Sequence, residues 1–84
     1  MSDKTTKYVR AYILMNVRLG KMNHVLSELK TIPGVTSIAA ITGEFDIIAR
    51  VETESLEELY NRTQEIHLIE GISETVTSIV QKEF

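Results

Sequence analysis

Apolar and polar positions alternate with a period of two along four stretches of the chain. Every odd position from Val9 to Val17 is apolar, which is the pattern of a strand with one buried face, so we predict a strand over residues 8–17. The same alternation, together with many β-branched side chains, predicts further strands at residues 35–41, 47–51 and 72–80.

Two segments between these strands follow the period of an amphipathic helix. In the first, the apolar positions Met22, Val25, Leu26 and Leu29 lie at the i, i+3, i+4, i+7 spacing. Pro33-Gly34 ends this helix. The second helix starts at Ser55-Leu56-Glu57-Glu58, a capping-box pattern, and ends before Gly71. Its predicted inner stripe consists of Leu56, Leu59, Tyr60, Thr63 and Ile66.

The predicted order is β-α-β-β-α-β, and an internal repeat supports it. Ile32-Pro33-Gly34-Val35 and Ile69-Glu70-Gly71-Ile72 each close a helix and open a strand. Right-handed crossovers then favour an α+β fold of the ferredoxin-like kind, a four-stranded antiparallel sheet with two helices on one face. We expect residues 1–7 to be a flexible N-terminus and residues 8–84 to form a single domain.

The second face of such a sheet is predicted to be exposed and apolar. We expect it to carry Tyr12, Leu14, Ile38, Ala40, Ile48 and Ile79, with Thr75 and Thr77 among them. Because a monomer rarely leaves such a patch in water, and because a chain of 84 residues has a small core, we predict that two sheets pack face to face across a two-fold axis.

Composition narrows the possible functions. The formal net charge is −3 and Lys and Arg are scattered, which disfavours direct nucleic-acid binding. The chain has no Cys, which excludes disulfides and thiolate metal sites. We expect a cytoplasmic protein, since no apolar run is long enough to span a membrane and no signal-peptide core follows residues 1–7. His24 and His67 lack the spacing of metal ligands, so we expect neither a metal nor another cofactor.

The most informative stretch is Ile41-Thr42-Gly43-Glu44-Phe45-Asp46-Ile47-Ile48, which joins two predicted strands. Its acids could bind an ammonium group, while hydroxyl and N–H groups could bind a carboxylate, as a small zwitterion such as an amino acid requires. The hydroxyls would come from Thr75, Thr77 and Ser78. The alternatives are an ordinary hairpin turn and a last strand rich in Thr and Ser because these residues suit strands.

These residues resemble the effector-binding (RAM) domain of the Lrp/AsnC transcriptional regulators. The resemblance rests on Ile32-Pro33-Gly34-Val35, on Thr42 to Val51 and on Thr75 to Val80, and covers the chain from about Tyr8. It implies an αβ-sandwich that dimerises through its sheet, forms tetramers or octamers and binds amino acids between dimers.

The resemblance also assigns roles to residues. It implies that Gly43, Glu44, Phe45 and Asp46 form one wall of the pocket, and that a neighbouring subunit supplies Thr75, Thr77 and Ser78. Residues 1–7 are too few for the family's helix-turn-helix domain, so we expect a stand-alone form that acts through partners, such as full-length regulators.

We therefore predict a non-catalytic, oligomeric module that binds an amino acid or similar metabolite and acts in transcription regulation. Two alternatives stay open. One is a small dimeric αβ-barrel enzyme, a monooxygenase or an isomerase, that uses His24 or Tyr12. The other is a structural assembly module without a pocket.

Overall fold

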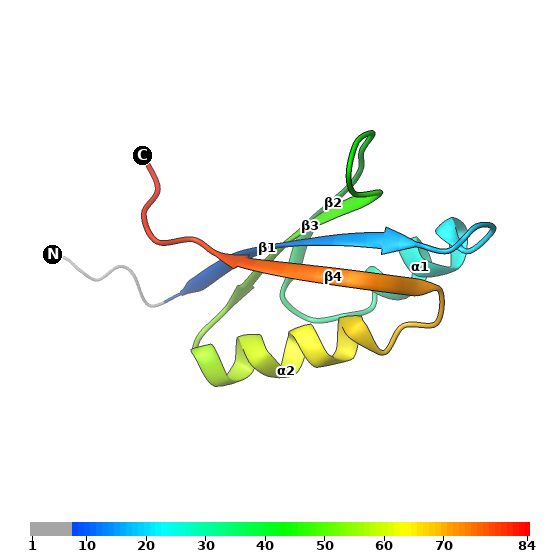
Figure 1. Ribbon diagram of the computed structural model, residues 1–84. Helices are drawn as coiled ribbons and strands as arrows, with labels where there is room; N and C mark the ends of the chain where they lie inside the picture. The colour runs from blue at the N-terminus through cyan, green and yellow to red at the C-terminus, as the bar shows by residue number, and fades with distance from the viewer. Residues whose placement is uncertain (1–7) are drawn as a thin grey trace, which may run out of the picture.

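Four strands and two helices follow one another in the predicted order (Figure 1). The computed structural model describes residues 8–84, so the flexible start predicted for residues 1–7 lies outside the described residues. The elements are β1 (Val9–Val17), α1 (Met22–Leu29), β2 (Val35–Ala40), β3 (Ile47–Thr53), α2 (Leu56–His67) and β4 (Ile72–Ile79). All neighbouring strands are antiparallel, in the order β2-β3-β1-β4, which confirms the ferredoxin-like α+β fold.

The core lies between the sheet and the helices. The two central strands present their odd-numbered side chains to it, and the helices contribute the apolar positions predicted from their period. The fully buried members include Ala11, Ile13, Met15, Ile47, Ala49, Val51, Val25, Leu29 and Ile66. Apolar burial of this kind is the main favourable term in folding. The two helices therefore cover one face and leave the other, here called the open face, uncovered.

Two β-bulges change which side chains reach the open face. Between β1 and β4 the register shifts at Asn16 and Val17. Between β2 and β3 it shifts after Val35. A bulge adds one residue to a strand and so reverses the alternation beyond it.

The predicted membership of the open face was therefore partly wrong. Thr75, Thr77 and Ile79 pair with the buried side of β1, and Ile38 and Ala40 pair with the buried side of β3. Since directly paired residues share a face, these five side chains lie on the helix side. Tyr12, Leu14 and Ile48 lie on the open face as predicted.

The observed open face carries a continuous row of apolar side chains. Leu14 of β1 pairs with Ile48 on one side and with Val76 on the other, and Ile48 pairs in turn with Ala39. We call these four residues the apolar row. It crosses all four strands, and Val76 is still 40% exposed. The described part of the chain therefore leaves an apolar strip of its sheet uncovered.

The second helix begins as its sequence predicts. The Ser55 hydroxyl oxygen accepts a hydrogen bond from the Glu58 N–H (3.0 Å), and the Glu58 carboxylate accepts one from the Glu54 N–H (3.1 Å). The return bond from Glu58 thus reaches Glu54, the residue before the cap residue Ser55.

The predicted inner stripe of α2 was only partly right. Leu59 and Ile66 are buried, Thr63 is half-buried, and Leu56 and Tyr60 are mostly exposed.

Neither α1 nor α2, the helices within residues 8–84, is long and apolar enough to cross a lipid bilayer.

The Ser55 cap can be tested directly. We expect Ser55→Ala to lower the free energy of unfolding by about 1 kcal/mol, because the Glu58 N–H loses its acceptor. Urea denaturation at one protein concentration measures this. Ser27→Ala, an exposed change inside α1, is the control and should cost nothing, since Ala is the better helix former. Equal stabilities of Ser55→Ala and wild type would show that the cap is not needed.

Candidate functional site

The loop between β2 and β3, residues 41–46, projects from the sheet on the side away from α2 (Figure 1). Gly43 has φ of 143°, a conformation that favours glycine. Glu44 is exposed and Phe45 is half-buried. The loop therefore presents a carboxylate to solvent beside the open face.

Asp46 fastens this loop to the end of β1. Its backbone N–H donates to the Met15 carbonyl (3.0 Å), and its carboxylate Oδ2 accepts from the Val17 N–H (2.9 Å). Its carbonyl accepts from the Ile41 N–H (2.9 Å). The Val17 N–H points to the β3 edge of β1, just beyond Met15, where the β1–β3 pairing ends. Asp46 thus has the structural role that the turn interpretation predicts, and this role uses one of its two carboxylate oxygens.

The three hydroxyl residues of β4 lie on two faces of the sheet. Thr75 and Thr77 face the helix side, whereas Ser78 pairs with Tyr12 and faces the open side. The Thr75 hydroxyl lies 3.4 Å from Nδ1 of His67 at the end of α2. Within one subunit, therefore, these residues are not gathered around the 41–46 loop.

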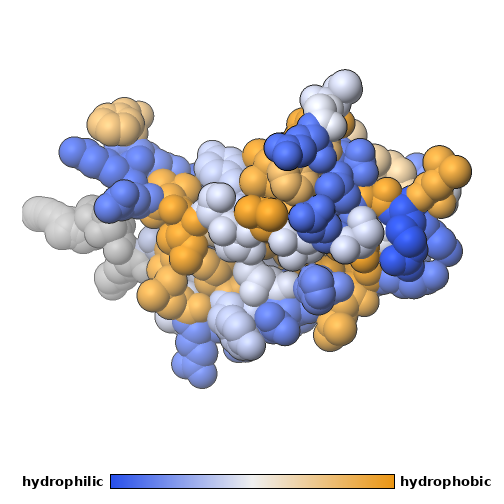
Figure 2. Space-filling model, in the orientation of Figure 1, coloured by the Kyte–Doolittle hydropathy of each residue, from blue (hydrophilic) through white to orange (hydrophobic). Residues whose placement is uncertain are grey.

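Thr77 lines an apolar notch between α2 and β4. The notch has a volume of about 230 Å³, and its other lining residues are Leu56, Leu59, Tyr60, Thr63 and Ile79. Figure 2 shows an apolar region over the start of α2 and the end of β4, on the left of that view. The exposed Leu56 and Tyr60 of α2 are therefore both at this notch.

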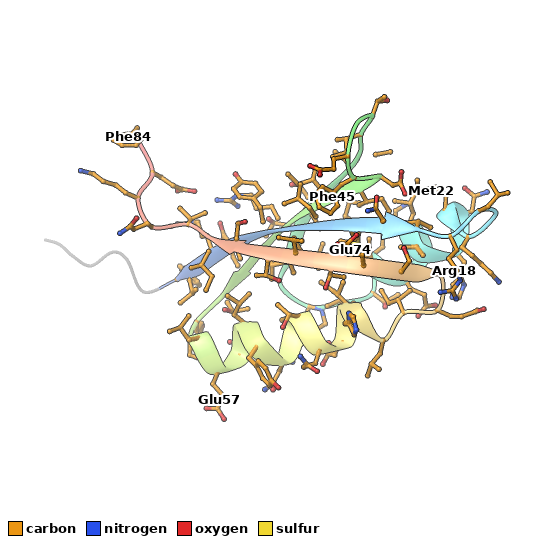
Figure 3. The ribbon with its side chains drawn as sticks, in the orientation of Figure 1. Arg18, Met22, Phe45, Glu57, Glu74 and Phe84 are labelled. Carbon is orange, nitrogen blue, oxygen red and sulfur yellow. The ribbon has the colours of Figure 1, made fainter. Side chains whose placement is uncertain are left out.

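Sequence reasoning missed two polar residues at the loop end of the open face. Asn16 Nδ2 donates to Glu74 Oε1 (3.2 Å), and Asn16 sits between the two β1 residues whose backbone Asp46 holds. Figure 3 labels Phe45 and Glu74 at this end of the sheet. Only the β1–β4 register brings Glu74 here, so strand alternation alone could not identify it. Glu44, Asp46 and Glu74 form what we call the acidic end, which suits a cationic group.

The opposite end of the open face carries an ion cluster, which we define as Arg10, Arg50, Glu52 and Glu83. Glu52 Oε2 accepts from Arg50 (2.6 Å) and from Arg10 Nε (3.1 Å). Glu83 lies 3.5 Å from Arg50 and 3.7 Å from Arg10. Hydrogen bonds from Arg50 and then Arg10 hold the pKa of the Glu52 carboxyl below its ordinary value.

The enzyme alternative required His24 or Tyr12 in a cavity between helices and sheet. Tyr12 lies on the open face, and His24 is exposed on α1, on the other side of the sheet. Neither side chain therefore lies between the helices and the sheet. Among residues 8–84, no three His, Asp or Glu side chains are arranged to hold a metal ion.

Comparisons with known proteins identify the family of this chain. Residues 10–84 match the family model described as the Lrp/AsnC ligand binding domain. The chain is 35% identical over 74 residues to the HTH-type transcriptional regulator FL11 of Pyrococcus furiosus, a match that covers 88% of this chain and 49% of that protein. The chain thus spans about half the length of the curated regulators it matches.

Two further matches bear on the same region. A solved structure, that of FFRP-DM1, superposes with a TM-score of 0.80 at 36% identity, over 86% of this chain and 97% of that one. A segment of 58 residues is 38% identical to part of the homocitrate synthase of Sulfurisphaera tokodaii, covering 69% of this chain but 13% of that enzyme. The fold is therefore shared with chains of very different length.

The structural role of Asp46 makes a prediction about stability. We expect Asp46→Ala to lower the free energy of unfolding by about 1–3 kcal/mol, because the part-buried Val17 N–H loses its acceptor. Asp46→Asn is the matched control: its amide oxygen can still accept that bond, so it should lose much less. Urea denaturation of the three proteins checks this. Equal losses in both variants would mean that the charge of Asp46, not its bond to Val17, stabilises the loop.

The ion cluster makes a prediction about pH. Since the pKa of Glu52 is lowered in the folded protein, its ion pairs stabilise the fold at neutral pH, and this contribution is lost as the pH falls below the ordinary value of 4.5. We expect Glu52→Gln to be less stable than wild type at pH 7, with the difference shrinking below pH 4.5. Urea denaturation across pH measures it. A difference between Glu52→Gln and wild type that stays constant with pH would contradict the assignment.

Proposed function

We propose, because the chain belongs to the Lrp/AsnC ligand-binding domain family, that it is a non-catalytic, oligomeric module that binds an amino acid or a similar small metabolite. Its homologues include parts of proteins named as transcriptional regulators. A role in transcription regulation through partner proteins, full-length regulators of the family among them, follows from that relationship.

The acidic end is the observation that supports the ligand class. The exposed Glu44 and the remaining oxygen of Asp46 offer negative charge where the 41–46 loop stands above the sheet. A primary ammonium group donates three hydrogen bonds and pairs with carboxylates. Gly43 leaves the loop backbone accessible beside them, since no atom lies within 4 Å of where its Cβ would be. We assign the ammonium end of the ligand to this wall.

The second wall comes from a neighbouring subunit. In one subunit the hydroxyls of β4 point to two different sides of the sheet. A neighbour can offer Thr75 and Thr77 from the helix side of its edge strand β4, and Ser78 from the open side of the same strand. Gly43, Glu44, Phe45 and Asp46 therefore form half a pocket that assembly completes.

The apolar row supplies a reason for assembly. Leu14, Ile48, Val76 and Ala39 lie in register across all four strands and would be covered by a second sheet. Such dimers can join further into tetramers or octamers. A ligand held between subunits then binds the assembled state more tightly and shifts the chain toward it, which is the physical basis of its regulatory effect.

An assembly module without any pocket would use the same apolar row. Ligand binding distinguishes the two functions, because a purely structural module would assemble equally well with and without metabolites.

The proposal is tested by titrating the chain with each common amino acid in a calorimeter and measuring particle size with and without the ligand. We expect at least one amino acid to bind and to shift the assembly. Asp46→Asn should weaken that binding by about 1–3 kcal/mol, because a charged amine loses its counter-charge while the Val17 bond persists.

A matched control is Glu57→Gln, which makes the same charge change on α2; Figure 3 shows Glu57 pointing away from the sheet. It should leave the affinity unchanged. Absence of binding and of any change in size at millimolar amino acid would overturn the sensor function. If Asp46→Asn bound the amino acid as tightly as wild type, the ammonium group would not bind at this loop.

A further inference from the structure

The open face changes character from one end to the other. Next to the apolar row lies a mixed row, in which Tyr12 pairs with Arg50 on one side and Ser78 on the other. Beyond it Arg10 pairs with Glu52. The Arg–Glu ion pairs thus gather at the end of the face that is remote from the 41–46 loop. A second sheet that covers the apolar row would also reach this end.

The segment that follows β4 adds the last member of the ion cluster. The Val80 N–H donates to the Arg10 carbonyl (2.8 Å), so the chain still runs beside β1 at this point. Residues 81–84 then rise from the sheet on the side away from α2 (Figure 1). Glu83 brings its carboxylate within 4 Å of both Arg10 and Arg50.

This segment stands over the end of the face and leaves the apolar row uncovered. Together with Tyr12, residues 80–84 enclose an open hollow of about 1010 Å³, and no member of the apolar row lines it. The segment therefore does not replace a second copy on the sheet. Its effect on the open face is electrostatic.

Glu83 decides the charge balance of the cluster. The two positive charges of its arginines are balanced by the two negative charges of its glutamates, all within the described chain. Without Glu83, two guanidinium groups share the single carboxylate of Glu52 and leave one unbalanced positive charge. Covering a balanced cluster retains its ion pairs, whereas covering an unbalanced charge removes its water without providing a partner.

We propose that Glu83 is an electrostatic latch for self-association: when it is seated on Arg10 and Arg50, the ion cluster carries no net charge and a second copy of this chain can cover it. Release of Glu83 leaves a net positive charge in the contact and favours separation. This inference rests on the sheet-to-sheet association proposed above, and it adds how that association is controlled.

The test is the dimer dissociation constant of the full chain, measured by sedimentation over a dilution series at low salt. We expect Glu83→Gln to raise the dissociation constant about tenfold, as is typical when one partner of a covered charge pair is removed. Glu57→Gln makes the same change in net charge on the helix side and should stay within about twofold of wild type. Circular dichroism confirms that each variant is folded.

A double variant separates charge balance from simple loss of contact. Arg10→Gln with Glu83→Gln removes one charge of each sign and leaves Arg50 paired with Glu52. Its dissociation constant should return toward the wild-type value, whereas a merely structural role of Glu83 predicts no recovery.

These measurements can contradict the role of Glu83 without contradicting the sheet-to-sheet association. Equal dissociation constants for Glu83→Gln and Glu57→Gln, or no recovery in the double variant, would overturn the latch while the dimer stands. A wild-type chain that stays monomeric at the highest concentration would overturn the sheet-to-sheet association and the latch with it.

Discussion

The arrangement of the molecule depends on β1, which is hydrogen-bonded along both of its edges. Its register with β3 and with β4 fixes which side chains of three strands are neighbours, and β3 passes that register on to β2. The odd positions of β1 enter the core, so the even positions must form the open face. The apolar row and the mixed row, as well as the Arg10–Glu52 pair, are all direct consequences of this one pairing.

The elements could be predicted from sequence because each carries its own local signal. The alternation of Val9 to Val17 and the helical spacing of Met22 to Leu29 describe single segments, and the Ser55 cap is completed within four residues. The bulges could not be predicted, because a bulge is a property of two strands in register. Thr75 and Ile38 were therefore assigned to the wrong face although their strands were correctly located. For the same reason, the alternation of β4 did not predict that Glu74 lies at the acidic end.

Asp46 illustrates why the two interpretations of the 41–46 loop do not exclude each other. One carboxylate oxygen accepts the Val17 N–H just beyond the Met15–Ile47 pair, where the end of the β1–β3 ladder leaves that group in need of a partner. A carboxylate has capacity for further hydrogen bonds, so the same side chain can stabilise the turn and face a ligand. The turn interpretation is thus confirmed, and it supplies the rigid support that a binding residue requires.

The acidic end and the ion cluster lie at opposite ends of one face, with the apolar row between them. A second copy seated on the apolar row would come close to both, so a change at either end alters the free energy of the same contact. As proposed, a ligand held at the acidic end would add contacts to the assembled state, while release of Glu83 at the other end would add an unbalanced charge to it. The two influences therefore act on one equilibrium with opposite sign. The ligand and Glu83 are then coupled without any conformational change within the sheet. Each affects the other because both change the same equilibrium between separate and joined copies.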